Sequence, residues 1–466
     1  MADDRQSTPL TASRPAGGAE LRGPAVAARD RRVPAWVLGA GGVLFAVSVA
    51  VLIIVFRSFP RQLLSMLDLH VYLWGGRLVR RSGDPYGPKF GKTNLYFTYT
   101  PMAAGFFALA AGIKLHTAKL LMTAASLASL VAAVWLTWGA LRYRRSAGRL
   151  GATLAVAALA LWIEPVQQTL AFGQVNLGLM FIIVADLCLP ESCWLKGAGV
   201  GVAAGFKLTP LIFIPYLMLT RRFRAAGVAT ATFVLTIAGS FLLMPKAAHQ
   251  YWSGNLFSNA QRLGNIAYVG NQSLNGALLR LLGGAAAARP YWLAAAAVVG
   301  AAGLVLAAWA SRRGHEMIGI LTCALTGLLV SPVSWSHHWV WIAPILVVLA
   351  DLALRPGSLP ASRLRRRAGW LGGLAVGALY FAYPLHRAPG TARLPAGLIW
   401  TVSGPAVQGT DMDGLQQLIG DLYPLAALAA LAVIAAMLAL PATGRGRALR
   451  AEPVAHAGLG QQVPRP

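Results

Sequence analysis

One carboxylate, Asp68, stands alone in the apolar stretch SMLDLHVYLW (residues 65–74). If this stretch is a helix, Asp68 shares a small polar face with Tyr72 and Gly75, which would leave room for a ligand above the carboxylate. The apolar side chains form the opposite stripe, which suits a helix lying on a membrane surface. A carboxylate in apolar surroundings is a candidate general base. The structural alternative is that Asp68 pairs with Arg61 or caps the local backbone.

Three further stretches carry polar residues that would be costly inside a membrane. They are WIEPVQQTLAFGQVN with Glu164, GFKLTP with Lys207, and SPVSWSHHWVW with His337 and His338. Lys207 needs a counter-charge, which either an anionic phosphate or Glu164 would supply. Adjacent histidines on a helix point about 100° apart, so we expect them to hydrogen-bond a phosphate or a sugar rather than share a metal ion.

Amides and aromatic rings are dense in the segment 245–290. This composition is typical of carbohydrate surfaces, because amides bond hydroxyl groups and rings cover sugar faces. Asn271 and Gln272 in this segment are therefore candidates for binding an acceptor sugar. Trp335, beside the histidine pair, is a third candidate; the alternative is that it belongs to the interfacial tryptophan belt of a membrane protein.

The composition decides the class of protein. Of 466 residues, 56% are hydrophobic and 12% are charged, whereas a soluble domain carries about 25% charged residues. Apolar runs recur along the chain, so we expect an all-α polytopic membrane protein. The net charge of +26 comes from short Lys and Arg clusters between these runs, which is typical of orientation signals. No basic surface interleaved with aromatics is present, so we expect no nucleic-acid partner.

Twelve membrane spans are predicted from the apolar runs. They cover about residues 35–56, 117–141, 150–164, 175–190, 194–206, 209–220, 225–244, 290–311, 315–333, 338–354, 369–386 and 421–442. The segment 99–113 is too short for a full span and is predicted to be interfacial or re-entrant, and the two short spans within 194–220 are predicted to be tilted or broken.

The Lys and Arg residues orient this arrangement. They are more numerous on the side that holds both termini, so both termini are predicted to be cytoplasmic. Residues 1–34 and 443–466 are predicted to be disordered cytoplasmic tails of a transmembrane domain at 35–442. The outer loops, at about 57–116, 245–290 and 387–420, then share one face with all of these polar stretches.

Taken in order, these motifs resemble glycosyltransferase family 87, membrane-embedded enzymes with the GT-C fold. The motifs are DLHVY (68–72), YTP (99–101), EP (164–165), GQVN (173–176), GFKLTP (205–210), NQS (271–273) and SWSHHWVW (334–341). They occupy about residues 60–345. The chain looks most similar to actinobacterial α-(1→2)-mannosyltransferases of phosphatidylinositol mannoside and lipomannan assembly, which use polyprenyl-phosphate-mannose.

The resemblance implies a bundle of about 12 transmembrane helices, with interfacial helices in the first outer loop. It implies a cell-membrane enzyme whose active site is on the outer face and whose base, Asp68, takes the proton from an acceptor hydroxyl as that oxygen attacks the anomeric carbon. No cofactor and no metal are implied, because the polyprenyl-phosphate sugar is a substrate. The implied partners are membrane lipids, this donor and a glycolipid acceptor. The candidates for binding the donor phosphate or sugar are Lys207, His337, His338, Glu164, Gln174, Asn176 and Tyr72.

Two alternatives remain open at this point. The same family includes arabinofuranosyltransferases, so the sugar could be arabinose instead of mannose. A transporter of lipids or sugars also fits twelve spans with both termini inside, but transporters place their polar sites near the membrane midplane at broken helices of repeated halves. Here the polar stretches lie at one edge, and the motifs occur once.

Overall fold

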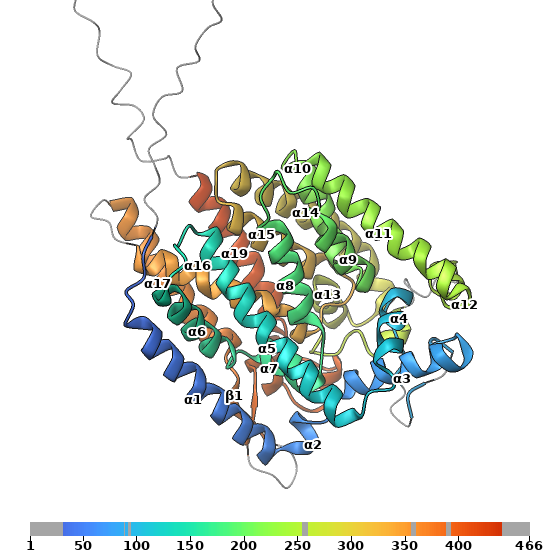
Figure 1. Cartoon of the computed structure of the whole chain (residues 1–466). Coiled ribbons are helices and arrows are strands. Elements are labelled where there is room, and N and C mark those ends of the chain that lie inside the picture. Colours follow the sequence, from blue (N-terminus) through green and yellow to red (C-terminus); the bar gives the residue numbers. More distant parts are fainter. Residues whose placement is uncertain are drawn as a thin grey trace, which may run out of the picture.

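Most described residues of the computed structural model lie in helices that pack side by side (Figure 1). The structure describes residues 31–87, 89–91, 95–253, 260–355, 360–387 and 393–439. The predicted tail at 443–466, and all but the last four residues of the one at 1–34, lie outside the described residues.

The elements follow one another along the chain in this order. The first half contains α1 (Val37–Ser58), α2 (Pro60–Leu63), α3 (Leu67–Ser82), α4 (Pro101–Ala110), α5 (Leu115–Ala140), α6 (Ala147–Ala160), α7 (Glu164–Phe172), α8 (Asn176–Leu187), α9 (Ala198–Phe206), η1 (Thr209–Ile212), α10 (Phe213–Leu219) and α11 (Phe223–Leu243). The second half contains α12 (Pro245–Ala248), η2 (His249–Ser253), η4 (Ala260–Leu263), α13 (Leu274–Leu282), α14 (Ala285–Arg312), α15 (Glu316–Val330), η5 (Ser336–Trp341), α16 (Ile342–Leu354), α17 (Pro360–Tyr380), β1 (Tyr383–Arg387), β2 (Arg393–Ala396), η6 (Leu398–Thr401), η7 (Gly404–Gln408), α18 (Gly414–Gly420) and α19 (Leu422–Ala439).

The helices confirm the prediction of a helical membrane protein. Among the described residues, six helical segments are long and apolar enough to cross a bilayer, namely α1, α5, α11, α14, η5 with α16, and α19. A seventh candidate is the pair α7 and α8, which is bent by 117°. Each of the twelve predicted spans overlaps a helix, but several are shorter than the roughly 20 residues that a full crossing needs, so the count of twelve stays a prediction.

Large apolar side chains on the outside of the bundle also fit a lipid environment. Leu242 and Leu243, at the end of α11, are 83% and 81% exposed. An apolar exterior of this kind is unfavourable in water and is covered by acyl chains in a bilayer.

The helix that overlaps the predicted span 369–386 ends before the span does. α17 begins nine residues earlier, at Pro360, and ends at Tyr380, after which β1 pairs antiparallel with β2 through the partners Tyr383 and Ala396. The apolar run continues to Leu385, but Pro384 cannot extend a helix and the residue before it disfavours helical backbone, so the chain is extended from Tyr383 onward.

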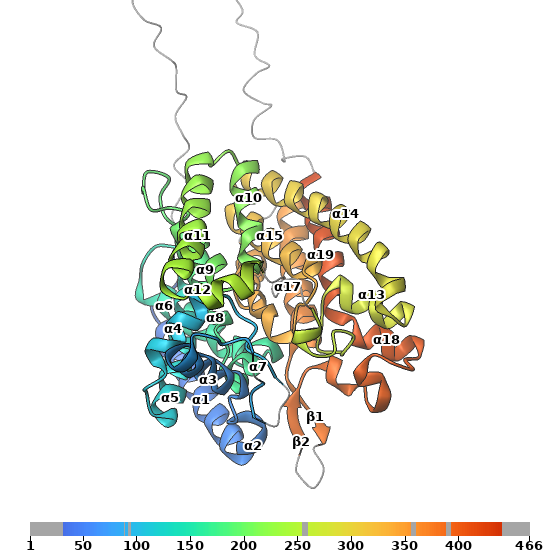
Figure 2. The same cartoon turned by 90° about the vertical axis from the view of Figure 1, so that its right-hand side faces the viewer.

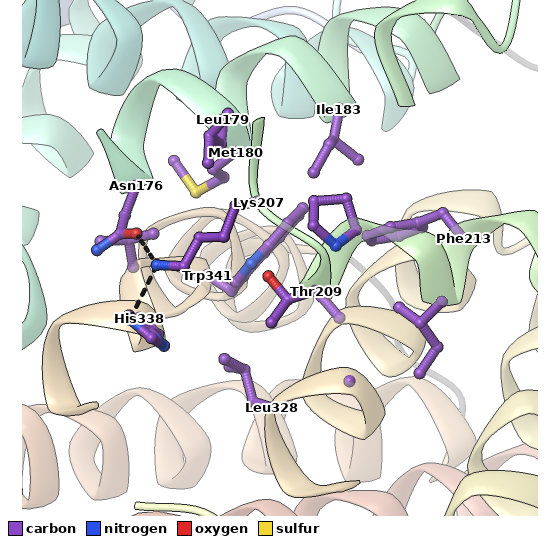
Figure 3. Close-up of a pocket in the computed structure, with 15 residues that line it drawn as sticks. Asn176, Leu179, Met180, Ile183, Lys207, Thr209, Phe213, Leu328, His338 and Trp341 are labelled. Carbon is purple, nitrogen blue, oxygen red and sulfur yellow. Dashed lines mark hydrogen bonds between the residues drawn. The ribbon is translucent and has the colours of Figure 1, made fainter. Parts of the chain in front are cut away.

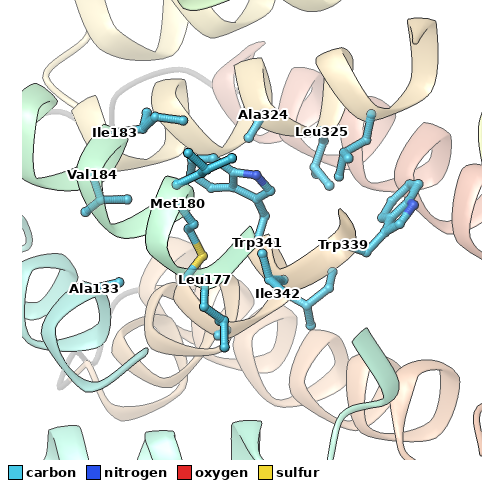
Figure 4. Packing of buried hydrophobic residues seen from close by; sticks show 14 of the residues in the cluster. Ala133, Leu177, Met180, Ile183, Val184, Ala324, Leu325, Trp339, Trp341 and Ile342 are labelled. Carbon is cyan, nitrogen blue, oxygen red and sulfur yellow. The ribbon is translucent and has the colours of Figure 1, made fainter. Parts of the chain in front are cut away.

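The core lies where α5, α8, α15 and η5–α16 meet (Figure 4). Met180 and Trp341 fill the space between α8 and η5, and Trp339 is fully buried on the other side of η5.

Glycines allow the backbones of α1 and α6 to approach closely. A Cβ on Gly41 of α1 would lie 2.0 Å from the carbonyl oxygen of Gly151 in α6, so this pair is held at backbone distance, as is common between membrane helices.

Several of the short elements lie together at one end of the bundle. Figure 2 shows α2, α3, α4, α7 and the β1–β2 hairpin together in the lower half of the molecule. This end carries Asp68 and several of the other sequence-predicted site residues.

A buried ion pair joins α13 to the start of α19. Arg280 donates through Nε to Asp421 Oδ1 at 3.0 Å and through Nη2 to the same oxygen. Its other N–H groups donate to the carbonyl oxygens of Ala267, Tyr268 and Asn271. The guanidinium therefore ties the segment before α13 to the last long helix.

We expect Arg280→Met to destabilise the protein by about 3–5 kcal/mol, because it leaves the Asp421 carboxylate buried without its partner. Thermal unfolding in detergent measures the effect. Asp421→Asn added to Arg280→Met should restore most of the loss, and Arg289→Met, at an exposed position of α14, is the control. A melting temperature of Arg280→Met equal to that of the wild type would contradict this account.

Candidate active site

Asp68 lies in the first turn of α3, where the positive end of the helix dipole favours a carboxylate. The helix predicted for residues 65–74 is thus confirmed from Leu67 onward. The expected free space over Gly75 is filled, because a Cβ there would lie only 2.3 Å from the Phe97 ring, whereas Asp68 itself is half-buried. Gly75 serves to admit this ring, which packs α3 against the chain that leads into α4.

A sharp bend between α7 and α8 brings two amides to the site. α7 ends at Gly173, whose φ of 66° is easy for glycine, and a Cβ there would lie 2.8 Å from Leu69 of α3. Gln174 and Asn176 follow directly, so the 117° bend turns both side chains toward the bundle interior next to α3.

Gln174 connects Asp68 to two tyrosines. Its Nε2 donates to Asp68 Oδ2 at 2.6 Å, and its Oε1 lies 2.6 Å from the hydroxyl of Tyr72 and 2.9 Å from that of Tyr99. The two hydroxyl oxygens are 2.9 Å apart. Among the described residues, Asp68 Oδ1 accepts no hydrogen bond, so one oxygen of the carboxylate is held and the other is free.

Lys207 is the next member of this polar cluster. It caps α9, whose last carbonyls at Gly205 and Phe206 accept hydrogen bonds from Thr100. The Lys207 ammonium donates to Asn176 Oδ1 at 3.0 Å and lies 3.5 Å from the Tyr99 hydroxyl. The contacts of Tyr99 with both Gln174 and Lys207 make the cluster continuous.

His338 completes the cluster. Its Nε2 lies 2.9 Å from Lys207 Nζ (Figure 3). When the ammonium donates to Nε2, the ring must carry its proton on Nδ1, which is buried and has no hydrogen-bond partner among the described residues. The site therefore presents a buried N–H donor next to the half-buried Lys207.

His337 points elsewhere. The two histidine rings are 80° apart, and His337 packs against Phe172. Its backbone carbonyl accepts hydrogen bonds from Thr169 and Asn176. His337 thus supports the bend between α7 and α8 through its backbone carbonyl, and its buried Nε2 has no partner among the described residues.

A narrow pocket opens beside Lys207 between α8, η1, α15 and η5 (Figure 3). Its polar end is formed by Asn176, Lys207 and His338. The rest of its wall is apolar, with Met180 and Trp341 among the lining residues. An anionic group carried on an apolar chain fits this distribution, because the charge can meet the ammonium while the chain meets hydrocarbon.

Three sequence-predicted residues are engaged in the structure itself. The Glu164 carboxylate accepts hydrogen bonds from Ser336 at 2.7 Å, Trp400 at 2.8 Å and Tyr423 at 2.9 Å, so it is neither the counter-charge of Lys207 nor part of the cluster. Asn271 and Gln272 are buried, and their amides bond backbone groups. The partners are Ile266, Pro332 and Ser334 for Asn271, and Val269, Gly420 and Tyr423 for Gln272.

Acceptor binding by Asn271 and Gln272 stays a prediction, but the N–H groups of both amides already donate to backbone carbonyls of the protein itself. Trp335 differs, because it is partly exposed and packs edge-on against Tyr268. It stays a candidate for covering a sugar face.

The environment of Asp68 alters its acidity. Loss of water around the side chain raises the pKa of the Asp68 carboxyl to about 6, while the hydrogen bond from Gln174 and the charge of Lys207 act in the opposite direction. The carboxylate is therefore ionised at neutral pH but more basic than an ordinary aspartate, as a general base should be. Burial lowers the pKa of Lys207, and the charge of Asp68 opposes that change.

Part of this site lies in a region that matches a known protein family. The model described as Glycosyltransferase family 87 matches residues 97–332. This region holds Tyr99, Gln174, Asn176 and Lys207, whereas Asp68 and the histidine pair lie outside it. No solved structure matches the chain significantly.

Curated relatives cover more of the chain. A "Polyprenol-phosphate-mannose-dependent alpha-(1-2)-phosphatidylinositol pentamannoside mannosyltransferase" of Mycobacterium tuberculosis (strain CDC 1551 / Oshkosh) is 36% identical over 328 residues, which are 69% of this chain and 74% of the relative. A "Polyprenol-phosphate-mannose-dependent alpha-(1-2)-phosphatidylinositol mannoside mannosyltransferase" of Mycolicibacterium smegmatis is 34% identical over 322 residues, 63% of this chain and 71% of the relative. Together with the family match over half of the sequence, these similarities show that the chain belongs to glycosyltransferase family 87.

Proposed function

We propose that this glycosyltransferase transfers mannose from polyprenyl-phosphate-mannose to a 2-hydroxyl of a mannosylated phosphatidylinositol or lipomannan acceptor. The observation that carries the proposal is the continuous cluster of Asp68, Gln174, Tyr99, Lys207 and His338, which sets a free carboxylate oxygen beside a cationic pocket with apolar walls. The names of the relatives supply the choice of mannose and of the acceptor class.

The chemistry is a direct displacement at the anomeric carbon. Asp68 Oδ1 removes the proton of the acceptor hydroxyl, and the acceptor oxygen forms the new bond to the anomeric carbon. The bond from that carbon to the phosphate oxygen breaks, and its electron pair leaves on the polyprenyl phosphate. Inversion converts a β-linked donor into an α-linked product. Asp68 is protonated at the end and returns its proton to solvent.

The leaving phosphate gains negative charge as the bond breaks. Lys207 and the Nδ1–H of His338 are the donors that stabilise this charge, and Asn176 holds the ammonium in place. The apolar wall of the pocket takes the first part of the polyprenyl chain. No nucleotide and no further cofactor is needed for this reaction.

The membrane arrangement belongs to the same proposal. Residues 35–442 form one catalytic domain of about twelve spans, with α3 and α4 lying at the outer interface. Both termini are cytoplasmic, and the active site faces the outer side of the plasma membrane. Support comes from the Lys and Arg distribution and from the ten-residue length of α4, about 15 Å, which is too short to cross.

Purified protein in nanodiscs tests the proposal. Labelled polyprenyl-phosphate-mannose is supplied with a mannosylated phosphatidylinositol, and the glycolipid product is analysed for a new α-(1→2) linkage. Parallel reactions contain polyprenyl-phosphate-arabinose or a nucleotide-linked mannose, and empty nanodiscs are the control. Product from the lipid-linked mannose alone supports the proposal. Product from polyprenyl-phosphate-arabinose alone would show that the enzyme is an arabinofuranosyltransferase. Movement of labelled lipid across vesicle membranes without sugar transfer would show that the protein is a transporter.

The rate of transfer should depend on pH through Asp68. The base must be ionised, and its pKa of about 6 means that kcat/KM should fall tenfold for each pH unit below that value. The donor, a phosphodiester, keeps its single charge throughout this range. A pH series from 4.5 to about 7 measures the acid limb. An acid limb with an apparent pKa near 4, the value of an ordinary aspartate, would show that Asp68 is not the base or is not desolvated in the complex.

A further inference from the structure

The carboxamide of Gln174 occupies a central place in the cluster. It is the one described group that contacts Asp68 by a hydrogen bond, and it lies at the end of the bend that Gly173 makes possible. The side chain is buried, and its backbone N–H donates to Thr169 at 2.9 Å, so the residue is held at both ends.

Two tyrosines decide which way the amide faces. Each hydroxyl has a single proton, so the triangle of Tyr72, Tyr99 and Gln174 Oε1 holds at most two hydrogen bonds at a time. In every arrangement with two hydrogen bonds, at least one O–H group donates to Oε1. A flipped amide would turn its oxygen to the Asp68 carboxylate and its N–H groups to two hydroxyls, losing the strongest contact.

Packing holds the tyrosines themselves. The Tyr72 ring is stacked on Phe107 of α4 with centroids 4.7 Å apart, and the Tyr99 ring meets Phe206 of α9 edge-on at 6.1 Å. Burial raises the pKa of both hydroxyls, so both stay protonated while Asp68 titrates. They therefore act as fixed donors.

We propose that Gln174 is the positioning residue of the base. It binds Oδ2 of Asp68 and so turns Oδ1 to the acceptor hydroxyl, and Tyr72 with Tyr99 clamps the Gln174 amide in the orientation that allows this. The inference rests on the proposed function, in which Asp68 is the base.

The clamp also joins the two halves of the reaction. Tyr99 touches Gln174 on one side and lies 3.5 Å from the Lys207 ammonium on the other, which is also 5.4 Å from the centre of its ring. The acceptor's base and the donor's phosphate group are thus held at a fixed separation through Gln174 and Tyr99. Direct displacement requires such alignment of the attacking and leaving oxygens.

The charged and titratable groups that face Asp68 are few. They are Lys207 at the end of α9, Tyr72 on α3 and Tyr99 before α4. The hydrogen bond from Gln174 favours the ionised carboxylate, so its removal should make Asp68 harder to ionise. Loss of the clamp should therefore change the pH profile, which a residue with a merely structural role would leave in place.

Three variants test the proposal in the nanodisc assay. Gln174→Met removes the amide, and we expect kcat to fall about 10- to 100-fold and the acid limb to move up by about one pH unit, with the donor KM little changed. Gln174→Glu places a second carboxylate against Asp68, and we expect a larger upward movement of the limb, since the two groups would share a proton. Gln408→Glu, at an exposed position, is the matched control.

Variants of the two tyrosines test the proposal independently, because they leave Gln174 unchanged. Tyr72→Phe and Tyr99→Phe each leave one O–H on Oε1, so each alone should cost less than about 2-fold in kcat, whereas the double variant should approach the roughly 10- to 100-fold loss of Gln174→Met. Tyr291→Phe, exposed on α14, is the control. Additive effects of the two single changes, or a wild-type acid limb in Gln174→Met, would overturn the proposal.

The two proposals fail in different ways. If the wild type transfers no sugar from any lipid-phosphate donor, the proposed function is wrong. If the wild type transfers mannose and the Asp68→Asn variant does not, the proposed function stands. If Gln174→Met then keeps the wild-type rate and acid limb, the positioning role of Gln174 is wrong.

Discussion

The Asp68→Asn variant is expected to transfer mannose at least about 100-fold, and up to about 10,000-fold, more slowly than the wild type. The substitution removes the proton acceptor but keeps the shape of the side chain, and the new carboxamide oxygen can still accept the hydrogen bond from Gln174. Donor affinity should change little, because Lys207, Asn176 and His338 are untouched. Single-turnover rates with saturating donor measure the chemical step directly.

The stability of this variant separates chemistry from misfolding. The carboxyl pKa is 3.8 in the unfolded chain and about 6 in the folded one, so ionisation of Asp68 lowers the stability of the folded protein as the pH rises from about 4 to 6, and the full cost is present above pH 6. A neutral asparagine removes that cost, and the melting temperature at pH 7 should equal or exceed that of the wild type.

A matched control isolates the position. Asp411→Asn alters an exposed carboxylate whose φ of 53° asparagine tolerates well, and it should leave the transfer rate unchanged. Transfer by Asp68→Asn within about threefold of the wild-type rate would remove Asp68 from the chemistry.

The sequence predicted the membrane class and most of the polar cluster for a common physical reason. Charged and amide side chains are costly between apolar helices, so Asp68, Lys207 and the GQVN stretch stood out against their neighbours. The structure brings them together across separations of 106 residues between Asp68 and Gln174 and of 131 between Lys207 and His338. For residues so far apart in the sequence, the topology predicts only that they lie on the same face of the membrane. It does not predict which of them are in contact.

Other predicted site residues of the same chemical types have hydrogen-bond partners inside the protein that the sequence does not show. Asn271 and Gln272 have the composition of a sugar site, but their amides bond backbone groups near Pro332 and Gly420. Glu164 has the charge to pair with Lys207, but three neutral donors hold it instead. A sequence does not show whether a buried amide or carboxylate already has its partners.

Tyr99 was missed for the opposite reason. It belongs to a family-like motif with Thr100 and Pro101, which start α4 in the structure, the threonine as its cap. A tyrosine in an apolar segment is usually read as a packing residue, however, and nothing local shows that its hydroxyl meets Gln174 and Lys207.

Removal of the charge at Lys207 should have the second large effect. Lys207→Gln keeps a polar side chain but loses the ammonium that faces the leaving phosphate, and we expect kcat/KM for the donor to fall about 100- to 1,000-fold. Lys246→Gln, at an exposed position of α12, is the control for a lost lysine charge. Donor titrations in nanodiscs, at constant acceptor, give kcat and KM separately. A loss confined to the acceptor KM would contradict the assignment of Lys207 to the donor.

The pH dependence of donor binding distinguishes a titrating ammonium from a fixed charge. Burial lowers the pKa of Lys207, so its charge is lost as the pH rises through that lowered value, and the donor KM of the wild type should rise with it. An anionic phosphate bound to the ammonium favours the protonated form, which links donor binding to proton uptake. Arginine stays protonated at every accessible pH, so the Lys207→Arg variant should bind the donor with a KM that no longer depends on pH, even where its larger side chain slows transfer. If Lys207→Arg and the wild type showed the same rise of KM with pH, the titrating group would be another residue, and Lys207 would not be the cation that binds the donor phosphate.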